Sequence, residues 1–236
     1  MNRGRYPQEE GEKGSKKWIQ ELVNLCPRLL DAHLQKERCL QPGKSISWRS
    51  PLRADGFSEY RDEGFLQLLD LQVCAQALGQ FWPDRGPQWD ALGIEETAPR
   101  YFLVEAKANI PEIVSECQAG SQESISLIES SLDRTQIFLG NNSLLPWSKS
   151  FYQYANRIAH LYFLREIAKV DAILVFVYFE NDYTHIVTSH EAWQGALLLQ
   201  KKLMGLSRHK LPNFIQEVFI DVKEIEDNRT REFSIQ

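Results

Sequence analysis

Apolar residues recur along the chain with two different periods, and the changes between them outline the expected elements. Spacings of three and four residues predict amphipathic helices, whereas short β-branched and aromatic runs predict strands. The predicted helices cover residues 16–34, 59–78, 112–132, 151–169 and 191–204, and the predicted strands cover residues 89–94, 100–108, 172–179 and 217–222. This order of elements predicts an α/β fold in which a mixed sheet is flanked by helices.

Local signals refine the first part of this pattern. Pro27 is expected to interrupt the helix at 16–34, because proline removes a helical hydrogen bond. Ser58 resembles an N-cap, since acidic residues follow it in the first turn of the helix predicted at 59–78. Residues 41–56 are predicted to form a loop.

The two central strands are joined by a short polar turn at 95–99, which predicts an antiparallel hairpin. Side chains alternate between the faces of a strand, so Glu105 and Lys107 should point to one face and Ala106 to the other. Charged residues at the end of an apolar strand are costly near a core unless they are paired or bind a metal ion. This hairpin is therefore the first candidate for a functional site.

Composition sets the limits of the prediction. The 236 residues favour a single domain over 15–236, preceded by a loose, charged tail at 1–14. The net charge of −5 gives no global attraction for nucleic acid, so such a partner requires a local basic patch or metal ions. No apolar run is long enough for a membrane span, and no signal peptide is visible. The dispersed cysteines favour reduced thiols and a cytoplasmic location; they are Cys26, Cys39, Cys74 and Cys117.

Asp90 and Glu105 lie symmetrically about a hairpin centre between Thr97 and Ala98, so they should face each other across the ladder. Two opposed carboxylates raise each other's pKa unless a cation lies between them. Oxygen ligands of this kind suit Mg²⁺ or Mn²⁺, which can activate a water molecule for attack on a phosphodiester. Lys107 could then orient the water or neutralise the developing charge. The alternative is a surface salt bridge between Glu105 and Lys107, with Asp90 ending a strand.

Asp90, followed after fourteen residues by Glu105-Ala106-Lys107, resembles the motif of the PD-(D/E)XK nuclease superfamily. The resemblance would cover roughly residues 59–179 and implies a restriction-endonuclease-like core. It also implies that Asp90 and Glu105 bind the metal ion, that the Ala106 carbonyl adds a third oxygen, and that Lys107 is the catalytic lysine. The motif alone is weak, because it occurs by chance in many chains.

Members of this superfamily often carry a glutamate on the helix before the hairpin, and Glu63 is the candidate here, with Glu59 as its rival. Trp89 stands where the superfamily has proline. A literal Pro83-Asp84 pair lies upstream, but pairing Asp84 with Glu105 would move the turn into the predicted strand. Asp90 is therefore the preferred metal ligand.

A polar stripe follows the predicted helix at 151–169, where Gln153, Asn156, Arg157 and His160 have helical spacing. In a functional interpretation, Gln153, Asn156 and Arg157 bind the substrate, reaching a phosphate or a base edge. Gln153 is similar to a glutamine that RecB-type nucleases place at the start of this helix, although Arg157 replaces the tyrosine expected four residues later. The alternative is an ordinary solvated helix face.

These features together predict a Mg²⁺- or Mn²⁺-dependent nuclease that acts on DNA, with a homodimer or a partner subunit extending its footprint. The alternative is a nuclease-fold protein without catalytic activity, serving as a binding or scaffold module of a restriction or defence system. No P-loop, G-x-S-x-G or G-x-G-x-x-G motif supports another chemistry.

Overall fold

The computed structural model describes residues 4–233 and centres on a five-stranded mixed sheet. In spatial order the strands are β2 (Ser47–Ser50), β4 (Ala91–Glu95), β5 (Arg100–Lys107), β6 (Ala172–Glu180) and β7 (Ile215–Asp221). The first three strands pair antiparallel, and β5, β6 and β7 run parallel. The predicted α/β class, a mixed sheet flanked by helices, is therefore confirmed.

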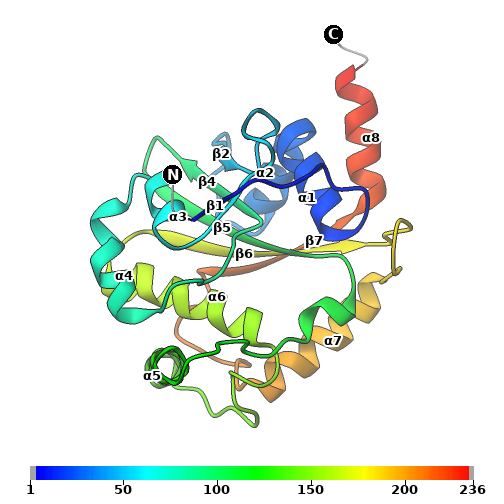
Figure 1. Ribbon diagram of the computed structural model, residues 1–236. Helices are drawn as coiled ribbons and strands as arrows, with labels where there is room; N and C mark the ends of the chain where they lie inside the picture. The colour runs from blue at the N-terminus through cyan, green and yellow to red at the C-terminus, as the bar shows by residue number, and fades with distance from the viewer. Residues whose placement is uncertain (1–3, 234–236) are drawn as a thin grey trace.

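Helices cover both faces of the sheet, as Figure 1 shows. One face carries α1 (Gly14–Leu25), α2 (Pro27–Lys36) and α8 (Val222–Phe233). The other carries α3 (Asp62–Leu68), α4 (Ala75–Phe81), α5 (Gln122–Leu139), α6 (Tyr152–Tyr162) and α7 (His190–Leu203). A π-helical turn at Phe163–Ile167 extends α6, and short 3₁₀ turns occur at Arg53–Asp55, Gln72–Cys74 and Ile110–Ile113.

Strand β5 separates the two cores, because its side chains alternate between them. Phe102, Val104 and Ala106 pack towards α1 and α2. Leu103 lies in the opposite core, beneath α6. Glu105 shares the face of Leu103, so its carboxylate enters a largely apolar layer, and the predicted separation of Glu105 from Ala106 is confirmed.

The predicted hairpin register is confirmed. Ala91 pairs with Val104 and Glu95 with Arg100, as predicted, and Asp90 lies just beyond the last of these pairs. The strand predicted at 172–179 is β6, and the helix predicted at 191–204 is α7. Pro27 does divide the first helical segment, since α2 begins at this proline.

The single helix predicted at 59–78 is wrong. The segment starts with β3 (Glu59–Tyr60), and α3 and α4 follow with a break between them. Asp62 and Asp70 both have positive φ, of 51° and 58°, which interrupts a continuous helix. Ser58 is no helix cap: it is fully buried, and its hydroxyl donates to the Asp55 carbonyl at 2.6 Å.

Two further predictions need correction, and one helix was not predicted. The helix predicted at 112–132 forms later, as α5, where Ser121 accepts a hydrogen bond from the Ser124 amide and caps the helix. The loop predicted at 41–56 contains β2, whose Trp48 is buried. Helix α8 directly follows the last strand and was not predicted.

The stretch predicted as a loose tail at 1–14 includes β1 (Arg5–Tyr6), which pairs antiparallel with β3; residues 1–3 lie outside the described residues. Arg5 also forms an ion pair with Asp55 at 2.7 Å. Across residues 4–233, no helix has the length and apolarity needed to span a bilayer. No disulfide joins the four cysteines, all of which lie within this range.

Candidate functional site

Asp90 lies immediately before β4, where its carboxylate extends the ladder. Its amide donates to the Val104 carbonyl at 3.2 Å, and its Oδ2 accepts from the Ala106 amide at 2.7 Å. Strand β4 pairs with β5 only from Ala91 onwards, so β4 offers no backbone partner to the Ala106 amide. The Asp90 side chain accepts the hydrogen bond of that amide instead. This bond holds one carboxylate oxygen of Asp90 against β5.

Glu105 is held by two cations. It is only 3% exposed, and its Oε1 lies 2.6 Å from Lys107 Nζ. Its Oε2 lies 2.5 Å from Arg157 Nη2 and accepts from Arg157 Nε at 2.7 Å. The ion pair between Glu105 and Lys107 that the alternative named is therefore present, but it is buried and not on the surface.

Helix α6 brings its polar stripe to the acidic residues. Arg157 donates to the Gln88 carbonyl at 2.7 Å and to Asn156 Oδ1 at 2.9 Å, in addition to its contact with Glu105. Gln153 Oε1 accepts from Lys107 Nζ at 2.9 Å. Because Asn156 and Arg157 are buried, the alternative of a solvated helix face is wrong for this part of α6.

His160 is the last residue of the polar stripe, and its side chain is buried in the core. It is 1% exposed, and burial lowers its pKa to about 3, so its ring is neutral at physiological pH. The ring packs edge-on against Trp82 at 4.9 Å, and its Nδ1 lies 2.8 Å from the Asn156 carbonyl. His160 therefore anchors α6 beside the site and does not supply a proton at neutral pH.

The ionisable groups of the site differ in the direction in which their pKa values are shifted. Burial, together with the charges of Glu105 and Glu59, raises the pKa of Asp90 well above its usual value. Burial opposes ionisation of Glu105 too, but the charges of Arg157 and Lys107 outweigh it and lower the Glu105 pKa. Burial favours the neutral form of Lys107, yet the charges of Glu105 and Asp90 prevail and raise its pKa. Without another cation, Asp90 is the group that gains a proton most readily.

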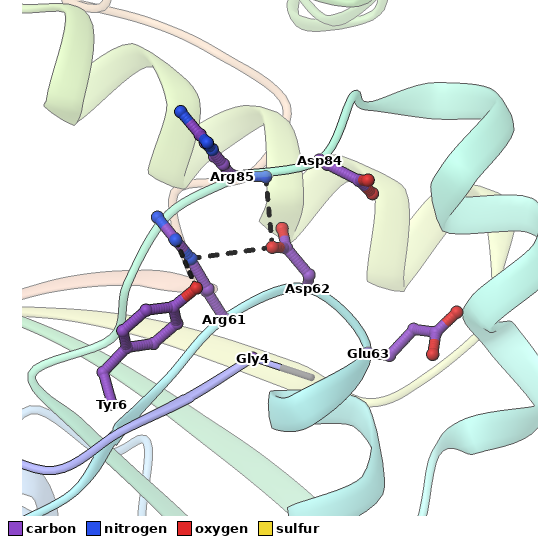
Figure 2. Close-up of a pocket in the computed structure, with 7 residues that line it drawn as sticks. All are labelled: Gly4, Tyr6, Arg61, Asp62, Glu63, Asp84 and Arg85. Atoms are coloured by element: carbon purple, nitrogen blue, oxygen red, sulfur yellow. Dashed lines mark hydrogen bonds and ion pairs between the residues drawn. The ribbon is translucent and has the colours of Figure 1, made fainter. Parts of the chain in front are cut away.

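The two glutamates proposed from sequence occupy different places. Burial is the largest of the influences that raise the pKa of Glu59, and the nearby charge of Glu105 adds to it. Gln88 donates to the Glu59 carboxylate, a contact that the sequence did not indicate. Glu63 is exposed and borders a separate pocket, where it points away from Arg61 (Figure 2). The structure thus brings Glu59 to Asp90 and Glu105, and it does not bring Glu63 there.

The oxygen atoms at this site suit a divalent cation in type. Asp90 has one oxygen outside its bond to Ala106, and Glu59 adds a second carboxylate. The Ala106 carbonyl points to the same side of β5 as the Ala106 amide, towards Asp90. However, in the described part of the chain, no three His, Cys, Asp or Glu side chains are arranged so that they could hold a metal ion together. The contacts of Glu105 explain this, because both of its oxygens face Lys107 or Arg157.

Comparison of the chain with protein-family models, with curated proteins and with solved structures finds no match.

Proposed function

We propose that the protein is a Mg²⁺- or Mn²⁺-dependent phosphodiesterase that cleaves nucleic acid. One observation carries the proposal: Asp90, Glu105 and Lys107 converge at one end of the β4–β5 hairpin, where Arg157 reaches them from α6. The order of elements around them, a carboxylate-bearing hairpin followed by a helix and a parallel strand, is the context on which the resemblance to PD-(D/E)XK nucleases rests.

In this proposal Asp90 and Glu105 bind the metal ion, with Glu59 in the place considered for Glu63 and the Ala106 carbonyl as a further oxygen. Such an ion would lower the pKa of a bound water and offset charge on the phosphodiester. Glu105 must release one of its cationic partners to contribute an oxygen, since both oxygens are engaged.

Lys107 has a different role, which its electrostatics suggest. The raised pKa keeps its amine protonated, so Lys107 can donate hydrogen bonds but cannot serve as a general base at neutral pH. Held between Glu105 and Gln153, the ammonium group is suited to orienting the attacking water and stabilising the charge that develops on the phosphate. Asn156 positions Arg157, which is suited to bind a phosphate oxygen once the metal ion competes for Glu105.

The proposed substrate is DNA, and the proposed location is the cytoplasm, where thiols remain reduced. The net charge of −5 limits the contact surface for a polyanion. A homodimer or a partner subunit would enlarge that surface.

Cleavage of labelled DNA and RNA in Mg²⁺, Mn²⁺ or EDTA tests the proposal. The wild-type protein should cut only with metal, and Asp90→Asn or Lys107→Gln should reduce the rate by at least about 100-fold, the scale expected when a group that stabilises the transition state is lost. Glu129→Gln is the matched control, because it removes an exposed carboxylate on α5, outside the site, and should cut normally. Full activity of Asp90→Asn would refute the assignment.

A second candidate function is a nuclease-fold binding module without catalytic activity. The observation that favours it is the closed ion-pair cluster, in which Glu105 is neutralised by Lys107 and Arg157 without a metal ion. Thermal unfolding separates the two functions. A metal-dependent enzyme should gain about 2.7 kcal/mol of stability at a metal concentration of 100 Kd, and Asp90→Asn should lose that gain, whereas a binding module should show no gain.

A further inference from the structure

The pocket that Glu63 borders, separate from the acidic cluster, has a volume of about 490 Å³ and contains two arginines. Figure 2 shows that the guanidinium groups of Arg61 and Arg85 extend to the same side of this pocket. The acidic side chains of Glu63 and Asp84 lie towards the opposite side in the same view. The pocket therefore has a cationic side despite its mixed composition.

Arg61 is held in position by its neighbours. Its guanidinium group stacks over the Tyr6 ring at 4.1 Å and donates to the Tyr6 hydroxyl. Its Nε is buried without a hydrogen-bond partner, since the nearest Asp62 oxygen is 3.6 Å away. Arg61 is thus a preorganised cation that is also in an ion pair with Asp62. A guanidinium group held in place can bind a further anion with little loss of side-chain entropy.

Arg85 is held through its backbone while its side chain stays free. The Asp62 carboxylate accepts from the Arg85 amide at 3.1 Å and from the Gly86 amide at 2.8 Å. Arg85 has a φ of 69° and Asp62 a φ of 51°, a conformation that is unfavourable for both residues. The exposed Arg85 guanidinium forms no ion pair or hydrogen bond with any described residue. The turn therefore presents an unpaired cation at the pocket.

The two arginines lie on segments that run directly into the acidic cluster. Arg61 follows Glu59 by two residues in extended backbone, so both side chains point to one face about 7 Å apart. The segment after Arg85 runs alongside, because the Trp89 amide donates to the Tyr60 carbonyl at 3.0 Å. Two short, adjacent segments thus connect the arginines with the acidic cluster.

We propose that Arg61 and Arg85 bind a backbone phosphate that flanks the phosphodiester held at the acidic cluster. This inference rests on the proposed function for its ligand, a nucleic-acid strand. Asp62 supports the site indirectly, because its carboxylate is engaged by two backbone amides.

The test measures DNA binding without cleavage, by fluorescence anisotropy in EDTA over a series of salt concentrations. Every protein carries Asp90→Asn, which prevents the proposed cleavage. The compared variants add Arg61→Gln with Arg85→Gln, Arg85→Gln alone, or the charge-matched control Arg28→Gln with Arg38→Gln. Arg28 and Arg38 are exposed and lie at α2, on the opposite face of the sheet.

Loss of one phosphate contact should reduce the slope of log affinity against log salt by about 0.9 for duplex DNA or about 0.7 for a single strand. This reduction is expected for Arg61→Gln with Arg85→Gln, and the control pair should keep the parent slope. Arg85→Gln alone guards against misfolding, because the guanidinium group forms no ion pair or hydrogen bond with any described residue. It should weaken binding without lowering the melting temperature.

Equal slopes for the test and control pairs would overturn the phosphate site, even if the wild-type protein cleaves DNA. An absence of DNA binding at low salt would overturn it as well. Conversely, if the wild-type protein cleaves nothing but the slope still depends on Arg61 and Arg85, the proposed catalysis fails and the phosphate site stands.

Discussion

Two neighbouring acid-to-amide substitutions, Glu105→Gln and Asp90→Asn, should change the stability of the metal-free protein in opposite directions. The pKa of Glu105 is lowered in the folded protein, so its negative charge contributes stability above its unfolded pKa and loses that contribution as pH falls. The pKa of Asp90 is raised, so its ionisation costs stability as pH rises above its unfolded pKa. At pH 8 the first substitution should therefore destabilise and the second should stabilise.

The magnitudes follow from burial and contacts. Glu105 is 3% exposed and neutralises Lys107 and Arg157, and removal of one member of such a buried pair costs about 3–5 kcal/mol. For a domain of this size that corresponds to a fall in Tm of roughly 6–20 °C. Asparagine at position 90 can still accept from the Ala106 amide, so Asp90→Asn should raise Tm by about 3–6 °C for each unit by which the Asp90 pKa is raised.

Thermal unfolding followed by circular dichroism at pH 8 in EDTA measures both effects. Glu63→Gln is the control, because it neutralises an exposed carboxylate and should change stability by less than about 0.5 kcal/mol. A lower Tm for Asp90→Asn, or an unchanged Tm for Glu105→Gln, would refute the distribution of charge described for this cluster.

Three further predictions concern pH and packing. Asp90 must release its proton before binding a cation, so the affinity for Mn²⁺ should rise with pH and calorimetry should detect proton release; a pH-independent affinity would contradict this. Burial raises the pKa of Asp31 to about 6. Between about pH 4 and pH 7 the wild-type protein should therefore lose about 2–3 kcal/mol of unfolding free energy relative to Asp31→Asn, measured by urea unfolding. Parallel curves of stability against pH for the two proteins would contradict this prediction. A Cβ on Gly93 would lie 2.4 Å from Ile46 Cγ2 and 2.9 Å from the Trp48 ring. Gly93→Ala should therefore cost about 1–3 kcal/mol of stability and speed amide exchange in β2. A neutral effect would disprove the close packing.

The hairpin was predictable because its information is local. Two apolar strands of matching length surround a short turn, and side-chain alternation then determines which residues oppose each other. The predicted register needed no knowledge of the rest of the chain, and the pairing of Ala91 with Val104 agrees with it up to the residue before Asp90.

Contacts between distant segments could not be predicted in this way. Arg157 contacts Glu105 across 52 positions, and on its helix a buried polar stripe has the same spacing as a solvated one. The choice between Glu59 and Glu63 depended on whether residues 59–61 were helical. Pairing of β3 with β1 makes them extended, and that interaction joins segments more than fifty positions apart.

The bond from the Ala106 amide to Asp90 affects how mutants of this site should be designed. Because one carboxylate oxygen terminates the sheet, replacement by alanine would leave an orphaned amide at the edge of the hairpin, at a cost of about 1–3 kcal/mol. Alanine scanning at this position would therefore confuse structural damage with lost chemistry. The same bond leaves a single oxygen of Asp90 for any ligand, so this residue would coordinate in a monodentate manner from a fixed direction.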